Sequence, residues 1–538
     1  MLLAISDVWK SESTRPPPDH HIIRAPTAHG DSGWASYIPS WAPSPRRTRP
    51  SLSKNPIAGF RNPWPSWHKP TASEIWDSFS WGADDDPCID LAASHLDGEH
   101  PATKFEPSQL PNFSDLSDWP GSLGAKAARL LRIEKPDFSF PPGNTRAKVT
   151  WLGHASVLVQ LPSITPGEDQ PVRCLFDPTF SMRCSPSQNA GPIRSYPPPC
   201  DVAHLPPIHA VFISHNHYDH MDCDTLVAIW KHSHDSVRFF VPLGNKPRLM
   251  EWGIFADRVT EMDWWDSAGL IYPSSIGGQI VVTCTPAQHN SWRSGVDADS
   301  TLWSSWCVEH YAPDQQKQPY RVFFAGDTGY QFHGDPSWPP RPPRLGSFEP
   351  ASPPAASTQK RGREEVRELP PCPAFAQIRE RIGPQHLLLL PVSVGASFAY
   401  LRSFVPLPDW INPFPRHSPG VTGANHMPPW DAVQVLKVMT ESEENVETDD
   451  GREEAAEVMP IVAVAMHWGT FVTEPIEVLK TLGQLEWACQ QHGVRFARSL
   501  DGLDAAGKEA DGPNGSVERP GLSEPWFVAL NHGQSVTV

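Results

Sequence analysis

The segment 215–220, HNHYDH, constrains this chain more than any other feature of its sequence. It follows the apolar run AVFIS, which is typical of a strand, and a helix is expected to begin near Asp222. Four side chains that can bind a metal ion occur within these six residues. They can converge only where the backbone forms a tight loop, and a junction between a strand and a helix supplies one. We interpret the segment as a metal site; the alternative is a polar loop that contains three histidines by chance.

The nine cysteines do not suggest a thiolate metal site or a disulfide framework. No two of them have the CxxC spacing, and their number is odd. We therefore expect free thiols and a reducing compartment. Any zinc must then be bound by imidazole nitrogen and carboxylate oxygen, which are the ligands that zinc takes without thiolates.

Further candidate ligands stand at the ends of three other apolar runs. IVVTCTPAQH ends at His289, RVFFAGDTG contains Asp327, and IVAVAMHWGT contains His467. In α/β folds the chemistry lies at the carboxyl ends of strands that run in the same direction, so we expect these side chains beside the 215–220 loop. Each alone is more often structural, but together they supply enough ligands for two metal ions, with Asp327 as the bridge. The expected ligands are His215, His217, Asp219, His220, His289, Asp327 and His467.

The remaining chain is organised around this pattern. From about residue 148 short strands alternate with helices, which predicts sheets flanked by helices. Residues 1–60 are rich in Pro, Ser, Arg and His without apolar periodicity, and we expect them to be disordered. Residues 61–147 are expected to form an N-terminal extension that packs on the main domain, 148–538. Disordered insertions are expected near 334–371, 441–457 and 507–520.

Charge and hydropathy exclude some classes of protein. The chain has 44 basic and 61 acidic residues, a formal charge of -17, whereas nucleic-acid binding needs clustered Lys and Arg. No secretory leader is expected. The most apolar window, 386–404, contains Pro391, Gly395 and Arg402, which favours a buried strand over a membrane span. We expect an intracellular protein, mitochondrial or cytoplasmic, with peripheral membrane contact.

At the ligand residues the sequence resembles the metallo-β-lactamase superfamily, whose signature is HxHxDH followed by a distant His, a bridging Asp and a final His. It is more specifically similar to N-acylphosphatidylethanolamine-hydrolysing phospholipase D, over about residues 64–532 apart from the insertions. The stretches that carry the resemblance include TWLGHASVLVQ, FDPTFSMRCSPSQNAGPIR, LPPIHAVFISHNHYDHMD, FFAGDTGY and MHWGTF. The resemblance implies a four-layer αββα sandwich, the metallo-β-lactamase fold.

The same resemblance implies two Zn²⁺ ions and a reaction. One zinc is expected on His215, His217 and His289, and the other on Asp219, His220 and His467. A hydroxide that bridges the metals would hydrolyse N-acylphosphatidylethanolamine to N-acylethanolamine and phosphatidic acid, since two zinc ions lower the pKa of a shared water. We expect catalytic roles for Asp219, Asp327 and His426. The expected partners are the phospholipid, a membrane surface and, as in the family, a second copy of the chain.

Three other predictions concern residues around the metals. Tyr218 and His426 are candidates for binding the phosphate of the substrate, with a structural role as the alternative. We interpret His154, in WLGHAS, as a packed strand histidine. The segment 395–425 is longer than its counterpart in the family, and its apolar part, 398–410, is a candidate for membrane contact.

Two alternative functions remain open from the sequence. The same fold could hydrolyse a small soluble ester, lactone or phosphodiester. The chain could also be a metal-stabilised binding protein without catalytic activity.

Overall fold

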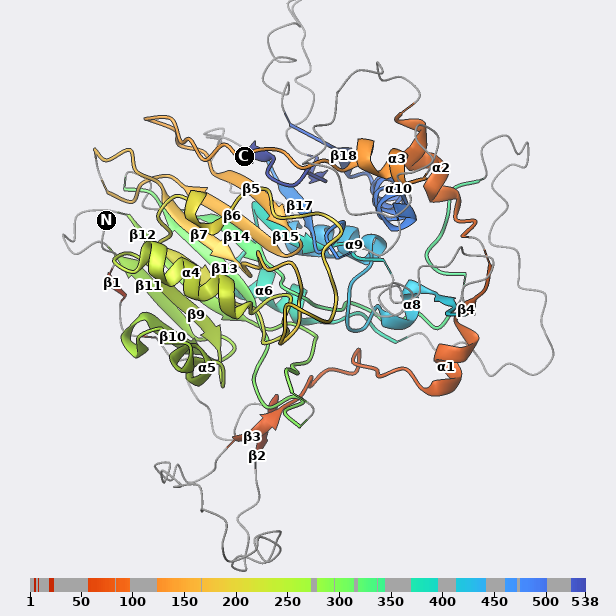
Figure 1. Ribbon diagram of the computed structural model, residues 1–538, viewed down its shortest axis with the longest axis horizontal. Helices are drawn as coiled ribbons and strands as arrows, with labels where there is room; N and C mark the ends of the chain where they lie inside the picture. The colour runs from red at the N-terminus through yellow and green to blue at the C-terminus, as the bar shows by residue number, and fades with distance from the viewer. Residues whose placement is uncertain are drawn as a thin grey trace, which may run out of the picture.

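Two large β-sheets packed face to face form the body of the molecule in a computed structural model of the chain (Figure 1). Ring contacts link the sheets: the centroids of Phe176 and Phe324 are 4.8 Å apart, and those of Phe212 and Trp306 are 5.6 Å apart. Truncating one of these buried rings to alanine is expected to cost about 3–5 kcal/mol. The structure describes residues 4–5, 8, 19–23, 57–82, 84–96, 123–165, 167–271, 278–294, 296–313, 318–335, 337–343, 369–394, 413–441, 460–471, 475–500 and 524–538.

One sheet has seven strands. From one edge to the middle of this sheet neighbouring strands are parallel, and from the middle to the other edge they are antiparallel. Along β6, Val157 and Val159 face the other sheet while Leu158 faces the helices outside, so both faces are covered by apolar side chains. The strand order is β10 (Val259–Met262), β9 (Arg238–Pro242), β8 (Ala210–Phe212), β7 (Val172–Phe176), β6 (Ser156–Leu161), β5 (Lys148–Gly153) and β20 (Ser535–Thr537).

The other sheet has nine strands, in the order β1 (Ala4–Ile5), β11 (Ser267–Ile271), β12 (Gln279–Thr285), β13 (Ser305–Tyr311), β14 (Tyr320–Phe324), β15 (Leu387–Pro391), β17 (Val462–Met466), β19 (Trp526–Val528) and β18 (Arg495–Ala497). Because β12 and β14 are both antiparallel to β13, they run in the same direction, and β15 and β17 are parallel to β14. The strands that precede His289, Asp327 and His467 therefore end at one edge of the sheet.

Helices cover the outer faces of both sheets (Figure 1). Leu226 and Ile229 of α4 (Cys223–Ser233) and Leu249 of α5 (Lys246–Glu251) pack on the seven-stranded sheet. Against the nine-stranded sheet lie α6 (Ala374–Ile382), α9 (Pro429–Thr440) and α10 (Pro475–His492), and Phe375 of α6 contacts Phe323 of β14. The expected four-layer αββα sandwich is confirmed.

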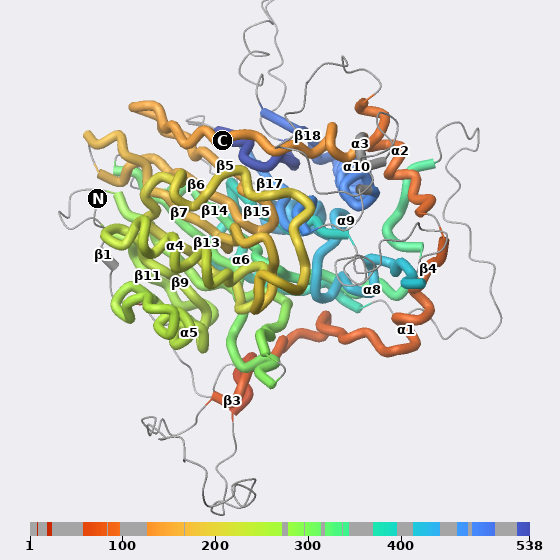
Figure 2. Tube along the Cα trace, viewed as in Figure 1, coloured from red at the N-terminus to blue at the C-terminus, as the bar shows by residue number. Residues whose placement is uncertain are grey.

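The described parts of the extension, residues 61–82, 84–96 and 123–147, lie along the side of this sandwich. In Figure 2 the red and orange tube passes from α1 (Ala72–Asp77) to α2 (Pro87–Ser94) and α3 (Leu123–Leu130), which contact α10. A side chain at Gly483 of α10 would overlap the carbonyl oxygen of Cys88, so glycine permits the close approach of the two helices. Lys480 of α10 also donates to Asp84 (2.9 Å).

The prediction of disorder for residues 1–60 is wrong for the pieces that the structure describes. β1 pairs with β11, and β2 (His21–Ile23) pairs with β3 (Ile57–Phe60). Strands of two to four residues are too short to show an apolar period in the sequence. They are held in place by their pairing partners elsewhere in the fold. Residues 24–56, most of the insertion 334–371, positions 442–457 and 507–520, and the segment 395–412 lie outside the described residues.

The remaining short elements include β4 (Phe79–Ser80), which pairs with β16 (Arg416–His417), and α8 (Pro419–Thr422). Two 3-10 helices span Val202–His204 and Ala256–Arg258. Among the described helices, none combines the length and the apolar character needed to cross a membrane.

Candidate metal centre

The 215–220 loop follows β8 and turns sharply before α4. The backbone N–H groups of His220 and Met221 both donate to the carbonyl of His217, at 3.2 and 2.9 Å. This tight turn points the side chains of the loop into the edge of the two sheets. All of the expected ligands, from this loop and from the ends of β12, β14 and β17, lie together there.

One group consists of three imidazoles. The Nε2 atom of His215 lies 2.8 Å from Nδ1 of His217, and that Nδ1 lies 3.4 Å from Nε2 of His289. His215 and His289 are fully buried. Three ring nitrogens from the loop and from the end of β12 thus face a common point, as one metal site would require.

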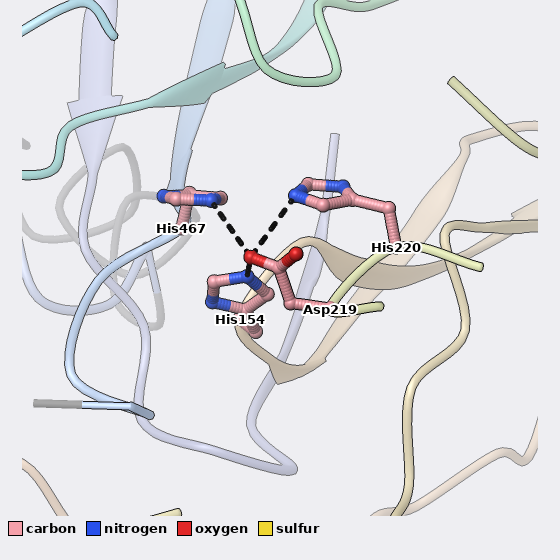
Figure 3. A group of neighbouring side chains, drawn as sticks. All are labelled: His154, Asp219, His220 and His467. Atoms are coloured by element: carbon pink, nitrogen blue, oxygen red, sulfur yellow. Dashed lines mark hydrogen bonds and ion pairs between the residues drawn. The ribbon is translucent and has the colours of Figure 1, made fainter. Parts of the chain in front are cut away.

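A second group surrounds the carboxylate of Asp219 (Figure 3). Its Oδ2 lies 3.6 Å from Nε2 of His220 and 3.8 Å from Nε2 of His467. Figure 3 shows a third ring, that of His154, pointing at the same carboxylate, with Nε2 3.0 Å from Oδ2. The predicted second set of ligands therefore comes together with one additional histidine.

The interpretation of His154 as a packed strand histidine is wrong. Gly153 and His154 have φ values of +101° and +51°, and this left-handed turn between β5 and β6 directs the ring toward Asp219. A histidine in a strand would instead follow the alternation of side chains along the strand. The turn is visible in the sequence only as a Gly-His pair between two apolar runs.

Asp327 lies between the two groups. Its Oδ1 is 2.9 Å from Nε2 of His467, and its Oδ2 is 3.1 Å from Nε2 of His220 and 3.9 Å from Nε2 of His289. The side chain is 1% exposed, so this carboxylate is removed from water. The carboxylate of Asp327 thus contacts histidines of both groups, and a ligand that bridges two metal ions needs this position.

Other side chains hold these histidines in orientation. Asp177, after β7, accepts from Nδ1 of His220 (2.7 Å) and from the hydroxyl of Ser214 (2.5 Å), which also contacts Nδ1 of His215 (2.8 Å). The backbone carbonyl of Asn425 accepts from Nδ1 of His289 (3.0 Å). Each contact leaves the other ring nitrogen facing the centre, as in metal sites whose histidines are fixed by outer hydrogen bonds. Asp177 was not among the predicted site residues, although its position after an apolar strand is a signal for such a role.

Burial and mutual contacts set the charges in the cluster. Burial lowers the pKa of His215 and of His289 well below the usual value, so both rings are neutral and can donate a lone pair. Burial alone would raise the pKa of Asp327, but His220 and His467 hold it well below the usual range. Conversely, burial would lower the pKa of His220, but Asp327 and Asp219 raise it. The carboxylates thus favour a positive charge at His220, and a metal cation could supply that charge in place of the proton.

Several buried atoms of the cluster have no hydrogen-bond partner. Three of them are Nε2 of His220, Nε2 of His467 and Oδ1 of Asp327. Buried polar atoms are nearly always satisfied, so each exception needs an explanation. Divalent cations among these lone pairs would satisfy all three atoms, and the chemistry of the donors fits a metal whose ligands are imidazole and carboxylate.

A cavity of about 580 Å³ opens onto the centre. His217, Asp219 and His467 lie at its floor, and its walls include Trp292, Val394, Trp468 and Phe471. Tyr218 lines the cavity with its ring, while its hydroxyl donates to the backbone carbonyl of Arg293 (3.1 Å). His426 also lines it, with Nε2 3.3 Å from Oδ2 of Asp327. Of the two predicted phosphate-binding residues, His426 therefore has a polar atom in contact with the metal-binding cluster, whereas the hydroxyl of Tyr218 contacts the backbone of Arg293.

The two packed sheets, the helices outside them and the cluster at the edge of the sheets are the arrangement of the metallo-β-lactamase fold. Residues 172–335 match the family described as the beta-lactamase superfamily domain. That stretch contains the 215–220 loop, His289 and Asp327. The matched residues make up less than a third of the chain, and they contain much of the cluster, which is a candidate site for divalent metal.

The particular branch is indicated by relatives in sequence. The chain is 33% identical over 322 residues to the yeast (Saccharomyces cerevisiae) N-acyl-phosphatidylethanolamine-hydrolyzing phospholipase D, mitochondrial, covering 59% of this chain and 48% of that protein. It is 37% identical over 184 residues to N-acyl-phosphatidylethanolamine-hydrolyzing phospholipase D 1 of Caenorhabditis elegans, covering 34% of this chain and 46% of that protein. The resemblance to this family is confirmed.

Other matches are less informative. An uncharacterized protein of Mycobacterium tuberculosis is 40% identical over 186 residues, covering 35% of this chain and 43% of that protein. The chain spans less than half the length of these curated relatives. Among solved structures, the diiron β-hydroxylase CmlA of Streptomyces venezuelae is 16% identical with a TM-score of 0.34, covering 74% of this chain and 55% of that one, which is too distant to bear on the site.

Proposed function

We propose that this protein is a zinc-dependent phosphodiesterase of the phospholipase D type. Its substrate would be N-acylphosphatidylethanolamine, which is hydrolysed to N-acylethanolamine and phosphatidic acid. The activity named for the yeast and nematode relatives supports this choice of substrate. The observation that carries the proposal is the position of Asp327 between two groups of buried metal-binding side chains at the floor of an apolar-walled cavity.

The donor set supports two zinc ions. His215, His217 and His289 would hold one, Asp219, His220 and His467 the other, and Asp327 would contact both. When bound, such a pair of ions supplies an activated water at neutral pH and stabilises negative charge on phosphoryl oxygens. In the hydrolysis, a bond forms between phosphorus and the oxygen of water. The bond between phosphorus and the ethanolamine oxygen breaks, and that oxygen takes up a proton.

Residues of the chain would orient the reactants. Asp219 lies in the cavity floor, where its carboxylate can accept a hydrogen bond from the attacking water. His426 has a side chain that is 17% exposed, and its Nε2 faces Asp327 from the cavity side. That nitrogen can donate to a phosphoryl oxygen of the substrate. We assign this contact to His426, and to Tyr218 a supporting place in the wall.

The walls of the cavity fit a lipid. Trp292, Val394 and Phe471 line it, and the side chain of Trp292 is 54% exposed. Ile193, next to the lining residue Pro192, is 50% exposed. Acyl chains could leave a bilayer along this apolar surface, so we propose peripheral membrane contact at the cavity mouth. The name of the yeast relative supports a mitochondrial location.

The experiment uses full-length protein loaded with Zn²⁺ and liposomes that contain N-acylphosphatidylethanolamine, in water enriched in ¹⁸O. Mass spectrometry should find N-acylethanolamine without label and phosphatidic acid with one ¹⁸O, because phosphorus is attacked.

Soluble esters, lactones and phosphodiesters are assayed in parallel. Activity on the soluble compounds alone would reject the lipid substrate. No hydrolysis of any compound, in a protein that metal stabilises, would instead favour a binding protein. Gel filtration of the same sample tests for the expected homodimer.

A further inference from the structure

A second cluster of metal-binding side chains joins the N-terminal segment to the main domain. Nε2 of His20 lies 2.8 Å from Oδ1 of Asp263, and Nε2 of His21 lies 2.8 Å from Oδ2 of the same carboxylate. The side chains of His20 and His21 are 7% and 8% exposed, and that of Asp263 is 17% exposed. Two imidazoles and a carboxylate thus converge in a nearly buried place, with residues distinct from those of the first centre.

The carboxylate is held in a fixed position. Asp263 follows β10, and its backbone N–H donates to Oδ2 of Asp266 (3.0 Å). The backbone N–H of Trp264 donates to Oδ1 of Asp263 (2.8 Å), and the Trp264 ring stacks on His20 at 4.2 Å between centroids. The other side of the cluster is fixed by β2, which begins at His21 and pairs with β3. A rigid frame of this kind suits a metal ion, which needs its ligands in place.

The contacts within the cluster are incomplete without a further group. Nε2 of His21 is buried and forms an ion-pair contact with Oδ2 of Asp263 at 2.8 Å, but it makes no hydrogen bond of regular geometry. Burial alone would raise the pKa of Asp263, but His20 and His21 lower it, so the carboxylate is ionised. A buried imidazole nitrogen that lies beside a carboxylate and a second imidazole is a typical environment for zinc.

We propose that His20, His21 and Asp263 bind a third divalent metal ion of the zinc type, which ties the N-terminal segment to the domain. The three side chains would supply three ligands, and water the fourth. The role of this ion is structural, since the cluster is absent from the lining of the cavity at the first centre.

The third site is connected to the first centre through the chain. The backbone carbonyl of His20 accepts from the N–H of Arg61 (2.9 Å), directly beside Asn62. The amide of Asn62 holds the backbone of His289 from both sides: Nδ2 donates to its carbonyl (2.6 Å), and Oδ1 accepts from its N–H (3.2 Å). The metal would therefore fix the segment that positions a ligand of the first centre.

Metal counting tests the proposal on full-length protein. The protein is stripped with a chelator, titrated with Zn²⁺ and analysed for tightly bound metal per chain. We expect His21→Asn to bind one equivalent fewer than the wild type. The control is His204→Asn, because His204 is an exposed histidine beside a carboxylate, Asp201, with side chains 70% and 85% exposed. Equal zinc contents in the wild type and His21→Asn would overturn the proposal and leave an ion-paired contact without metal.

A second variant keeps the test decisive if His21→Asn folds poorly. His21→Cys places a thiolate, which is also a zinc ligand, at the same position. We expect this variant to retain the full zinc content and to show a thiolate-to-cobalt absorption band when loaded with Co²⁺. If the variant is fully loaded with cobalt and the band is absent, the assignment of residue 21 as a metal ligand is wrong. Both readouts are independent of hydrolysis, so they hold whatever substrate the first centre takes.

Discussion

Nε2 of His154 lies 3.0 Å from Oδ2 of Asp219, and the backbone carbonyl of His154 accepts from the N–H of His467 (2.9 Å). One residue thus contacts two ligands of the same group. Burial and the neighbouring His467 lower the pKa of His154 to about 3, so its ring is neutral. A neutral ring can either donate to Asp219 or offer a lone pair to a metal, and in both cases it orients the second group.

His154→Gln is expected to reduce the affinity for metal at the second group by about 10- to 100-fold, the usual effect of residues that orient ligands. Competition with a chelator of known affinity measures this change. The control is His310→Gln, since His310 is 4% exposed and contacts the carbonyl of Pro162 away from the centre. An equal loss of affinity in both variants would mean that His154 acts only through packing.

Asp327→Asn is expected to abolish hydrolysis while the fold is retained. The change keeps the shape but removes the negative charge that faces His220, His289 and His467. Activity should fall by more than about 100-fold, beyond the effect of residues outside the ligand set. Circular dichroism checks the fold. A variant that keeps its activity contradicts the bridging role.

Asp177→Asn should weaken metal binding by about 10- to 100-fold and leave the substrate KM unchanged at saturating zinc. The carboxylate fixes Nδ1 of His220 and the hydroxyl of Ser214, and it is not in the cavity wall. Zinc titration with activity as the readout separates the two effects. Were the activity of the variant not rescued by excess zinc, the orienting role would be wrong.

Two buried histidines predict how stability depends on pH. Nδ1 of His209 accepts from the N–H of Arg173, and Nδ1 of His386 accepts from the N–H of Arg321, both at 3.0 Å. Burial, helped by the adjacent arginine, lowers the pKa of each histidine to about 4. The folded chain then binds fewer protons than the unfolded chain below about pH 6.5, so stability falls as pH decreases from there toward 4.

The expected slope is about 1.4 kcal/mol per pH unit for each histidine. Unfolding in urea at pH 4.5, 5.5 and 6.5 measures it on metal-free protein. His209→Gln should remove about that much of the slope, whereas His204→Gln, at an exposed position, should leave it unchanged. An unaltered slope in His209→Gln would contradict the neutral state of this histidine.

The sequence predicted the main ligands because each follows a strongly apolar strand, and strands that run in the same direction bring their ends together. Long periodic elements were equally accessible: the helical patterns over residues 374–382 and 475–492 coincide with α6 and α10. β10 and β11 were missed, since they are short and half polar or glycine-containing. Their pairing depends on neighbouring strands and not on a local pattern.

The residues that the sequence analysis missed act through geometry that no local pattern records. His154 reaches Asp219 because of a left-handed turn, and Asn62 holds His289 from a position 227 residues away. Likewise, His20 and His21 lie in a segment with the composition of disorder, but they meet Asp263 of the main domain. Such contacts between distant segments appear only in the folded chain.

The central claim is that the buried cluster binds two metal ions with Asp327 between them. A crystal structure of the zinc-loaded protein, with anomalous data collected on both sides of the zinc edge, tests it most directly. We predict two anomalous peaks, one against His215, His217 and His289 and one against Asp219, His220 and His467, each within about 2.0–2.2 Å of its ligand atoms. A single peak in the cluster, or none, would contradict the account.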